Sequence, residues 1–275
     1  MAESISKKKT GDSKLVLPKP LEPYVDPLPG VETANLSGKL IVIEGPDAVG
    51  RSTQVTQLRL WLEQEGHAVL DTGMARSALA GKGIAQAKEG NTLGPVTATL
   101  YYVTDFADRL ENEIIPALRA GFVVLTDRYI FSMMARAIAR GEDREWIERV
   151  CGFGLVPHAV YYLRAKVKDL VSRVVIGRGA FDYWESGMDY HFGNDMYESF
   201  VNYQTRLIRV LDRMSARYGF IEIDASKPPE IIFRELQRRI ASLQIRKVNG
   251  AAAGVVRKAP AGVTRKAPAV GKVSA

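Results

Sequence analysis

The sequence predicts an α/β fold in which helices flank a parallel β-sheet. Short apolar, β-branched runs alternate with longer helical segments, and 46% of the 275 residues are hydrophobic against 25% charged. That composition is typical of a globular protein. Strands separated by helices pair in parallel through right-handed crossovers. Ligands bind at the carboxyl ends of the strands in such sheets, so we expect the functional residues directly after the strands.

Five strands are expected. The first, residues 40–43, reads Leu-Ile-Val-Ile and stands before a glycine. Such a short apolar, β-branched run is expected for a strand that is buried on both faces. The other four expected strands cover residues 68–70, 122–126, 159–163 and 220–224.

Helices are expected between these strands. One covers about residues 52–65, with Gly66 as its C-terminal stop. A long helical stretch covers residues 95–120 and ends at Gly121, and a last helix covers about residues 229–243.

Segments of different composition flank this expected domain, residues 38–246. Residues 1–37 are rich in lysine and proline and predict an extended arm that lies on the domain without regular structure. Residues 247–275 alternate alanine, proline, glycine and lysine, which cannot bury enough apolar surface to offset chain entropy, so a disordered basic tail is expected.

The positive charge is concentrated in the two flanking segments. The chain carries +7 overall, but residues 247–275 hold six Lys and Arg and no acidic residue, and residues 1–20 add a net +3. The remainder is close to neutral, so the basic charge of the whole chain is only weak evidence that the folded body binds nucleic acid. The tail is then either a solubilising segment or a weak contact for nucleic acid or another polyanion.

The sequence also limits the cellular setting. Cys151 is the one cysteine, and the three histidines, His67, His158 and His191, are far apart, so neither a disulfide nor a zinc site is expected. No run of eighteen apolar residues occurs, and no apolar stretch follows the N-terminal lysines. We expect a cytoplasmic protein without a membrane partner.

A glycine-bounded loop follows the first strand. Residues 45–52, Gly-Pro-Asp-Ala-Val-Gly-Arg-Ser, fit the phosphate-binding pattern G-x-x-x-x-G-K-[ST] except at Arg51. Its amide N–H groups and the next helix N-terminus form an anion site, and Ser52 can ligate Mg²⁺. The fold is therefore expected to be of the three-layer P-loop NTPase type. The expected ATP-binding residues are Gly45, Pro46, Asp47, Ala48, Val49, Gly50, Arg51, Ser52 and Thr53.

Arg51 is the main departure from this pattern. Arginine keeps the positive charge but replaces a compact ammonium with a wide planar fork. We expect it to neutralise the β- and γ-phosphate oxygens during catalysis. The alternative is a loop that binds phosphate without catalysing its transfer.

The chain resembles the thymidylate kinase family over about residues 38–245. The resemblance is carried by the loop block at residues 43–54, an Ala-Asp-Arg block at 107–109, an Asp-Arg-Tyr-x-x-Ser block at 127–132, and a lid-like stretch at 173–185. It implies a magnesium-dependent kinase of nucleotide biosynthesis with a short arginine-bearing lid. That transferase moves the ATP γ-phosphoryl group to a nucleoside 5′-monophosphate, dTMP or a related nucleotide, and works as a homodimer.

The resemblance also implies residue roles. Asp47 would accept a hydrogen bond from the 3′-hydroxyl of the acceptor sugar, Arg128 would hold the acceptor phosphate, and Arg109 would reach the base. Asp127 would hold Mg²⁺ through water. Arg178 would stabilise the transferring group and is preferred over Arg173, because Ala48 stands where some members carry this arginine in the loop.

The acceptor side departs from the family pattern. Asp105 stands where an aromatic residue stacks on thymine, and Arg136 replaces a tyrosine that helps to exclude a ribose 2′-hydroxyl. We therefore expect an acceptor site that has diverged. The alternatives are a P-loop kinase for another small acceptor, and a catalytically silent nucleotide-binding module with a nucleic-acid-binding tail. For two of the residues an alternative without a functional role also stands: Arg109 would lie on a solvated helix face, and Arg178 would be an ordinary loop cation.

Overall fold

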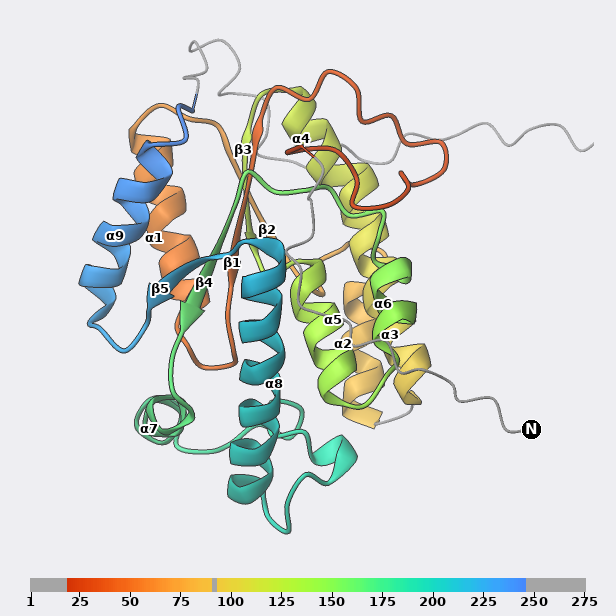
Figure 1. Ribbon diagram of the computed structural model, residues 1–275, viewed down its shortest axis with the longest axis vertical. Coiled ribbons are helices and arrows are strands. Elements are labelled where there is room, and N and C mark those ends of the chain that lie inside the picture. The colour runs from red at the N-terminus through yellow and green to blue at the C-terminus, as the bar shows by residue number, and fades with distance from the viewer. Residues whose placement is uncertain (1–18, 91–92, 246–275) are drawn as a thin grey trace, which may run out of the picture.

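The five predicted strands form one parallel sheet in the residues that the computed structural model describes, 19–90 and 93–245 (Figure 1). The strand order is β2-β3-β1-β4-β5, and every neighbouring pair is parallel. This confirms the α/β fold class. The strands are β1 (Lys39–Glu44), β2 (Val69–Gly73), β3 (Val123–Asp127), β4 (Ala159–Arg164) and β5 (Ile221–Asp224).

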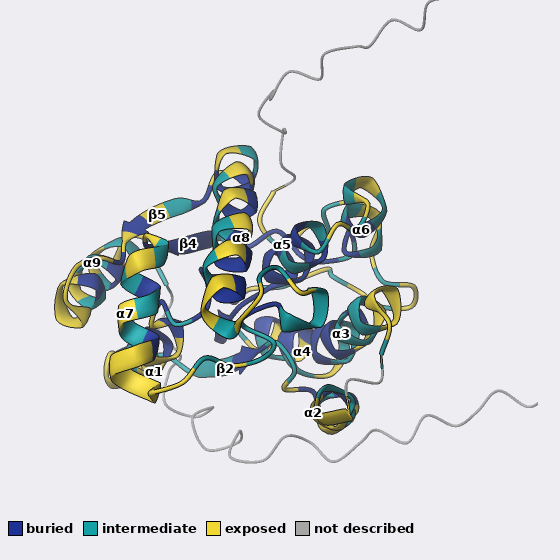
Figure 2. Ribbon diagram, turned by 90° about the horizontal axis from the view of Figure 1, so that it is seen from below, coloured by how far each residue is buried: buried dark blue, intermediate teal, exposed yellow. Residues whose placement is uncertain are grey.

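Helices cover both faces of the sheet because β1 is apolar on both sides. Residues 40–43 of β1 are fully buried. Ile41 and Ile43 pack with α1 (Arg51–Gln64) and α9 (Pro229–Ala241) on one face. Leu40 and Val42 belong to the core on the other face, with α5 (Ile130–Ala139) and α8 (Met196–Tyr218). Figure 2 shows the buried residues of the sheet and the exposed outer sides of the helices.

The predicted helical stretch 95–120 is confirmed as one continuous run with a local change of winding. It consists of α3 (Pro95–Arg109), a π-helical turn η1 (Leu110–Ile114) and α4 (Ile115–Arg119). The remaining elements are α2 (Gly81–Gly90), α6 (Arg144–Val150), α7 (Val167–Arg178) and a 3₁₀ turn η2 (Met188–Tyr190).

Residues 19–37 contain neither helix nor strand and lie against the residues that precede β4. Backbone hydrogen bonds join Leu21 N to Val156 O at 2.8 Å, Tyr24 N to Gly154 O at 3.0 Å and Val25 N to Gly152 O at 2.8 Å. The Tyr24 ring makes edge contacts with Phe131 and Tyr218, with ring centroids 6.0 and 5.7 Å apart. This segment therefore closes one side of the core around α5 and α8.

Part of the predicted division of the chain lies beyond the described residues. Residues 1–18 of the predicted arm and the whole predicted tail, 247–275, are outside them, so the disordered tail stays a prediction. Within the described part, no helix has the length and apolar character needed to cross a membrane.

We predict that Tyr24→Ala lowers the free energy of unfolding by about 2–3 kcal/mol, because it removes a partly buried ring from aromatic edge contacts. Tyr24→Phe keeps the ring and serves as the control, with an expected loss well below that of the alanine variant. Urea unfolding measures both. A Tyr24→Ala variant as stable as the unaltered protein would show that the aromatic contacts of Tyr24 add no stability.

Candidate functional site

The loop at residues 45–50 turns at the positions where the glycine pattern predicts it. Gly45 has φ +154°, and a Cβ there would stand 2.8 Å from the Leu163 carbonyl oxygen. Gly50 has φ +96° and caps the N-terminus of α1. Both backbone conformations favour glycine. The loop therefore brings its amide groups to the carboxyl edge of the sheet, beside the start of α1.

The Arg51 side chain links the phosphate loop to the end of β3. Its Nε donates to Asp127 Oδ1 at 2.8 Å, and its Nη1 donates to the carbonyl oxygens of Gly45, at 2.7 Å, and Pro46. The Arg51 side chain is 9% exposed. In this state the guanidinium neutralises Asp127 and fixes the loop entry.

Asp127 and Ser52 form a pair of oxygen groups at the helix N-terminus. Ser52 Oγ donates to Asp127 Oδ2 at 2.7 Å. Burial opposes ionisation of Asp127, but Arg51, Arg128 and the Ser52 hydrogen bond outweigh it and hold the pKa of this carboxyl below its ordinary value. An ionised carboxylate beside a hydroxyl is a donor set that suits Mg²⁺, which takes few protein ligands and keeps several waters.

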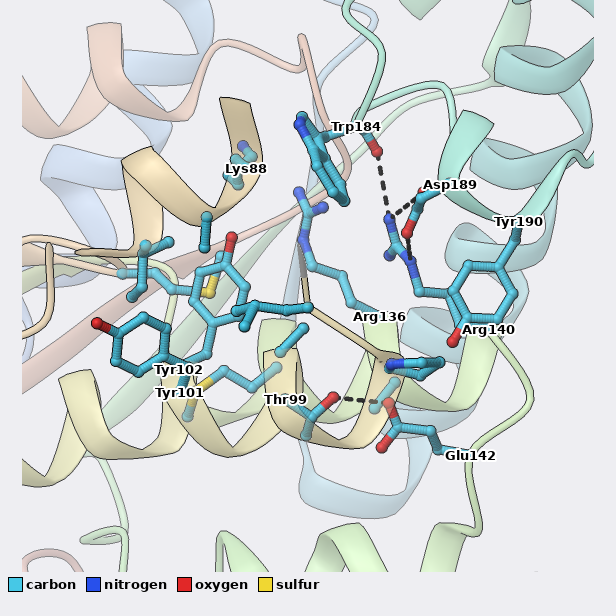
Figure 3. A pocket seen from close by; sticks show the side chains of 18 residues that line it. Lys88, Thr99, Tyr101, Tyr102, Arg136, Arg140, Glu142, Trp184, Asp189 and Tyr190 are labelled. Atoms are coloured by element: carbon cyan, nitrogen blue, oxygen red, sulfur yellow. Dashed lines mark hydrogen bonds and ion pairs between the residues drawn. The ribbon is translucent and has the colours of Figure 1, made fainter. Parts of the chain in front are cut away.

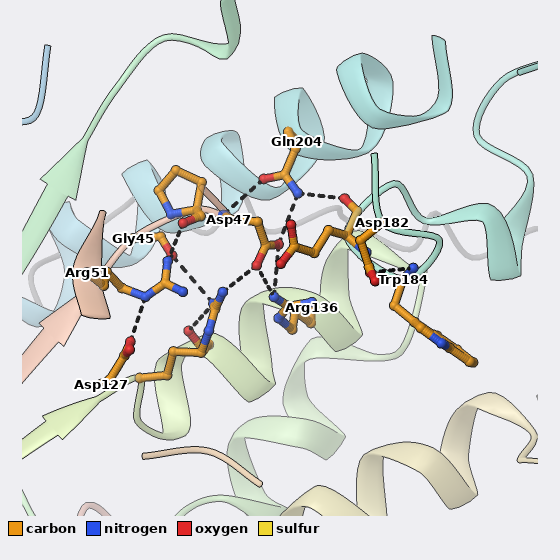
Figure 4. A network of polar contacts seen from close by, with 12 residues as sticks. Gly45, Asp47, Arg51, Asp127, Arg136, Asp182, Trp184 and Gln204 are labelled. Carbon is orange, nitrogen blue, oxygen red and sulfur yellow. Dashed lines mark hydrogen bonds and ion pairs between the residues drawn. The ribbon is translucent and has the colours of Figure 1, made fainter. Parts of the chain in front are cut away.

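Asp47 is the centre of a second polar cluster (Figure 4). Its Oδ1 accepts from Arg128 Nη2 and from Arg136 Nη2, the latter at 2.7 Å. Its Oδ2 accepts from Arg136 Nη2 at 2.9 Å and from Gln204 Nε2 at 3.0 Å. Burial opposes ionisation of Asp47, but the arginines Arg136, Arg128 and Arg51 outweigh it and hold the pKa of this carboxyl well below its usual range.

Gln204 and Glu44 were given no role by sequence reasoning, yet both are fully buried at the site. Gln204 Oε1 accepts from the Asp47 amide at 3.3 Å, and its Nε2 also donates to the Glu185 carbonyl at 2.8 Å. Glu44 accepts from the Tyr129 amide at 2.8 Å and from Ser132 Oγ at 2.6 Å. Glu44 thereby fixes the start of α5. Its place at the end of β1 was a usable signal, whereas Gln204 lies in the middle of α8 and gave none.

Arg128 lies between the two clusters. Its backbone has φ +72°, its amide donates to Ile43 O at 3.1 Å, and its Nη1 donates to Ser132 Oγ at 3.2 Å. Burial and the neighbouring Arg51 lower the pKa of its guanidinium to about 10. Arg51, Arg128 and Arg136 thus lie close together, and clustered cations favour a bound anion.

Arg109 is buried and does not lie on a solvated helix face. Its side chain is 1% exposed, and its Nε donates to Asp105 Oδ2 at 3.0 Å. Asp105 also accepts from the backbone amides of Ala75 and Ser77, at 2.9 and 2.8 Å. This carboxylate therefore fixes the turn that follows β2. The predicted contact between Arg109 and the acceptor base stays a prediction.

A cavity of about 250 Å³ opens beside Arg136, between α2, α3, α5 and residues 184–190 (Figure 3). Most of its wall is apolar or aromatic, with Met133, Tyr102 and Trp184 among the lining residues. Lys88 lies over the Trp184 ring, 5.6 Å from its centroid. An apolar and aromatic wall with a few charged groups suits a flat organic ligand.

The two arginines of the lid-like stretch lie in different surroundings. Arg173, in α7, donates to the Val49 carbonyl at 2.8 Å and therefore contacts the phosphate loop directly. Arg178, at the end of α7, is half exposed and donates to Glu185 Oε2 at 2.6 Å. The preference for Arg178 as the catalytic arginine stays a prediction.

Comparisons with known proteins agree with this geometry. The family model described as thymidylate kinase matches residues 43–236. The chain is 32% identical to "Probable thymidylate kinase 2" of Saccharolobus solfataricus over 194 residues, covering 70% of this chain and 91% of that protein. It is 31% identical to a thymidylate kinase of Clavibacter michiganensis, covering 76% of this chain and 97% of that protein.

We predict that Asp127→Asn lowers the free energy of unfolding by about 3 kcal/mol at pH 7, because it leaves the buried Arg51 without its anion. The folded-state pKa of Asp127 lies below the unfolded value, so its contribution is complete above the unfolded pKa and is lost as the pH falls through the folded pKa. The difference between the two proteins should therefore shrink below about pH 4. Urea unfolding from pH 7 to pH 3 measures it, and a difference independent of pH would contradict this account.

Proposed function

The chain belongs to the thymidylate kinase family, and on that basis we propose that it transfers the γ-phosphoryl group of ATP to a nucleoside 5′-monophosphate, dTMP or a related nucleotide, in the presence of Mg²⁺. One observation carries the proposal: the phosphate loop and the buried Arg128 lie at the same edge of the sheet. Arg128 Nη1 is 3.5 Å from the Gly45 carbonyl oxygen. Donor and acceptor phosphates bound to these two elements would be neighbours.

The donor phosphates would bind to the amides of residues 45–53. Phosphoryl transfer needs in-line positioning and neutralisation of the negative charge that spreads over the transferring group. Arg51 supplies one cation at the loop, and its contact with Asp127 fixes where that cation lies. Its bonds to the loop carbonyls also give some support to the silent-module alternative, since they engage the guanidinium without a ligand.

Ser52 and Asp127 would hold Mg²⁺, Ser52 through its hydroxyl and Asp127 through water. Their oxygens lie 2.7 Å apart at the mouth of the loop, which suits a metal with few protein ligands. The ion would neutralise charge on the β- and γ-phosphates.

The acceptor would bind through Arg128 and Asp47. The two Asp47 oxygens accept hydrogen bonds from Arg128, Arg136 and Gln204. If Arg128 turned to the acceptor phosphate, Asp47 Oδ1 would regain a free position. A sugar hydroxyl could then donate to Asp47, so phosphate binding and sugar binding would support each other.

Arg178 would complete the site when the lid closes. It must leave Glu185 to do so, and an exposed ion pair of this kind holds its partners weakly. Closure would also exclude water that hydrolyses ATP. Arg173 already donates to Val49 in the loop and would act there as a positioning residue. A homodimer and a nucleic-acid contact of the tail remain predictions.

We predict that the purified protein consumes ATP with Mg²⁺ when a nucleoside monophosphate is added, and that Arg51→Ala and Asp127→Ala each lower kcat by on the order of 100-fold or more. A coupled assay over a panel of monophosphates measures both effects. Tight ATP binding without turnover for every acceptor would favour the silent module, and efficient turnover of dTMP alone would contradict a diverged acceptor site.

We predict that Arg128→Met raises KM for the acceptor and lowers kcat/KM by on the order of 100-fold, because a charge-assisted contact to the phosphate is lost. KM for ATP should change much less. The control is Arg144→Met, which removes a surface arginine paired with Glu148 on α6. Equal losses in the two variants would show that the effect is not specific to the acceptor site.

A further inference from the structure

Two arginines, one just before α5 and one in the middle of it, share the carboxylate of Asp47 from the phosphate loop, and the cavity opens beside the second arginine. Arg128 precedes the helix and donates to Ser132 Oγ, and Arg136 lies one turn beyond Ser132 on the same side. Arg128 and Arg136 both donate to Asp47. Of these three charged groups, Arg136 alone is among the described residues that line the cavity. The order is therefore Arg128, Asp47, Arg136, cavity. Figure 4 shows Asp47 beside Arg136, and Figure 3 shows Arg136 at the cavity.

Arg136 has donor capacity that the protein does not use. Its Nη2 makes both contacts to Asp47, while its Nε is buried and finds no hydrogen-bond partner within the described part of the chain. The side chain is 18% exposed, and it reaches the cavity wall. A buried donor without a partner is unfavourable, and a ligand oxygen that accepts from Nε would relieve that cost.

The groups of a ribonucleotide follow the same order. The sugar carries its 5′-phosphate on one side, and around the ring the 3′-hydroxyl is followed by the 2′-hydroxyl and then by the base. With the phosphate on Arg128, the 3′-hydroxyl on Asp47 and the base in the cavity, Arg136 lies level with the 2′ position. A ribonucleotide has an oxygen there, and a deoxyribonucleotide has only hydrogen.

We propose that Arg136 is a specificity-determining residue that donates a hydrogen bond to the 2′-oxygen of the acceptor, so that the preferred acceptors are ribonucleoside 5′-monophosphates. The inference rests on the proposed function, because it takes the phosphate and sugar contacts from there. Adjacent hydroxyls of one sugar would then bind the two members of one ion pair, the 3′-hydroxyl as donor to Asp47 and the 2′-oxygen as acceptor from Arg136. The ion pair thereby fixes the spacing of the two contacts.

The test compares acceptors that differ only at the 2′ position. UMP and dUMP, CMP and dCMP, AMP and dAMP, and GMP and dGMP are assayed with ATP and Mg²⁺. Within each pair that is turned over, kcat/KM should favour the ribonucleotide roughly 10- to 100-fold, the range of a hydrogen bond to a charged group. Cytosine arabinoside 5′-monophosphate, whose 2′-hydroxyl is on the opposite face of the ring, should behave like dCMP. A deoxyribonucleotide used as well as its ribonucleotide, or better, would overturn the inference.

Variants then assign the preference to Arg136. Arg136→Met should bring the ratio of ribonucleotide to deoxyribonucleotide kcat/KM close to one, and Arg136→Lys should keep part of it. The matched control is Arg140→Met, one turn further along, whose guanidinium pairs with Asp189 at 2.9 Å and also lines the cavity. It should leave the ratio unchanged. If Arg136→Met weakened both substrates equally, Arg136 would act on the phosphate or on Asp47, and the inference would fail.

Binding measurements separate this inference from the proposed function. If no monophosphate accepts a phosphoryl group, the proposed function fails, whatever the sugar. Titration calorimetry of UMP and dUMP against the unaltered protein, without ATP, then still tests Arg136. Tighter binding of UMP supports the inference, and equal binding overturns it.

Discussion

Charge balance between buried arginines and aspartates determines the arrangement of the site. Arg51, Arg128 and Arg136 share the two carboxylates of Asp47 and Asp127, and all five side chains are largely buried. Buried ion pairs are costly unless every charge is well bonded, so each of these groups fixes the position of the next. The phosphate loop, the end of β3 and the first turns of α5 are thereby held at one edge of the sheet. The three arginines gathered at this edge favour a bound phosphate.

The local features of this arrangement could be predicted from the sequence. A β-branched run that is buried on both faces is an unambiguous central strand, and the glycines at positions 45 and 50 are required by backbone conformations that other residues adopt only with strain. Each of these signals is contained in a few consecutive residues. Some helices were harder to predict from the sequence. In α8, polar residues alternate with aromatic and aliphatic ones, and no strand directly precedes the helix.

The contacts between distant segments could not be predicted. Gln204 binds Asp47 across 157 positions of sequence, and no local pattern in α8 indicates this. Arg109 matches a family motif, but the structure buries it against Asp105. The motif does not predict this ion pair, because Asp105 itself departs from the family pattern. Asp105 stands where the family pattern has an aromatic residue, and its carboxylate instead fixes the turn at Ala75 and Ser77. A substitution in one element therefore changes the surroundings of a residue one turn away.

The contact between residues 19–37 and the segment before β4 has a consequence for the order of folding. Leu21 and Tyr24 leave the ribosome early, but their hydrogen-bond acceptors, Val156 and Gly154, are synthesised far later. Contacts of such high sequence separation form late, since the intervening chain must first be ordered. The nascent N-terminal segment must wait without its partners until β1, β3 and α5 have assembled. Its docking against α5 and α8 then completes that side of the core.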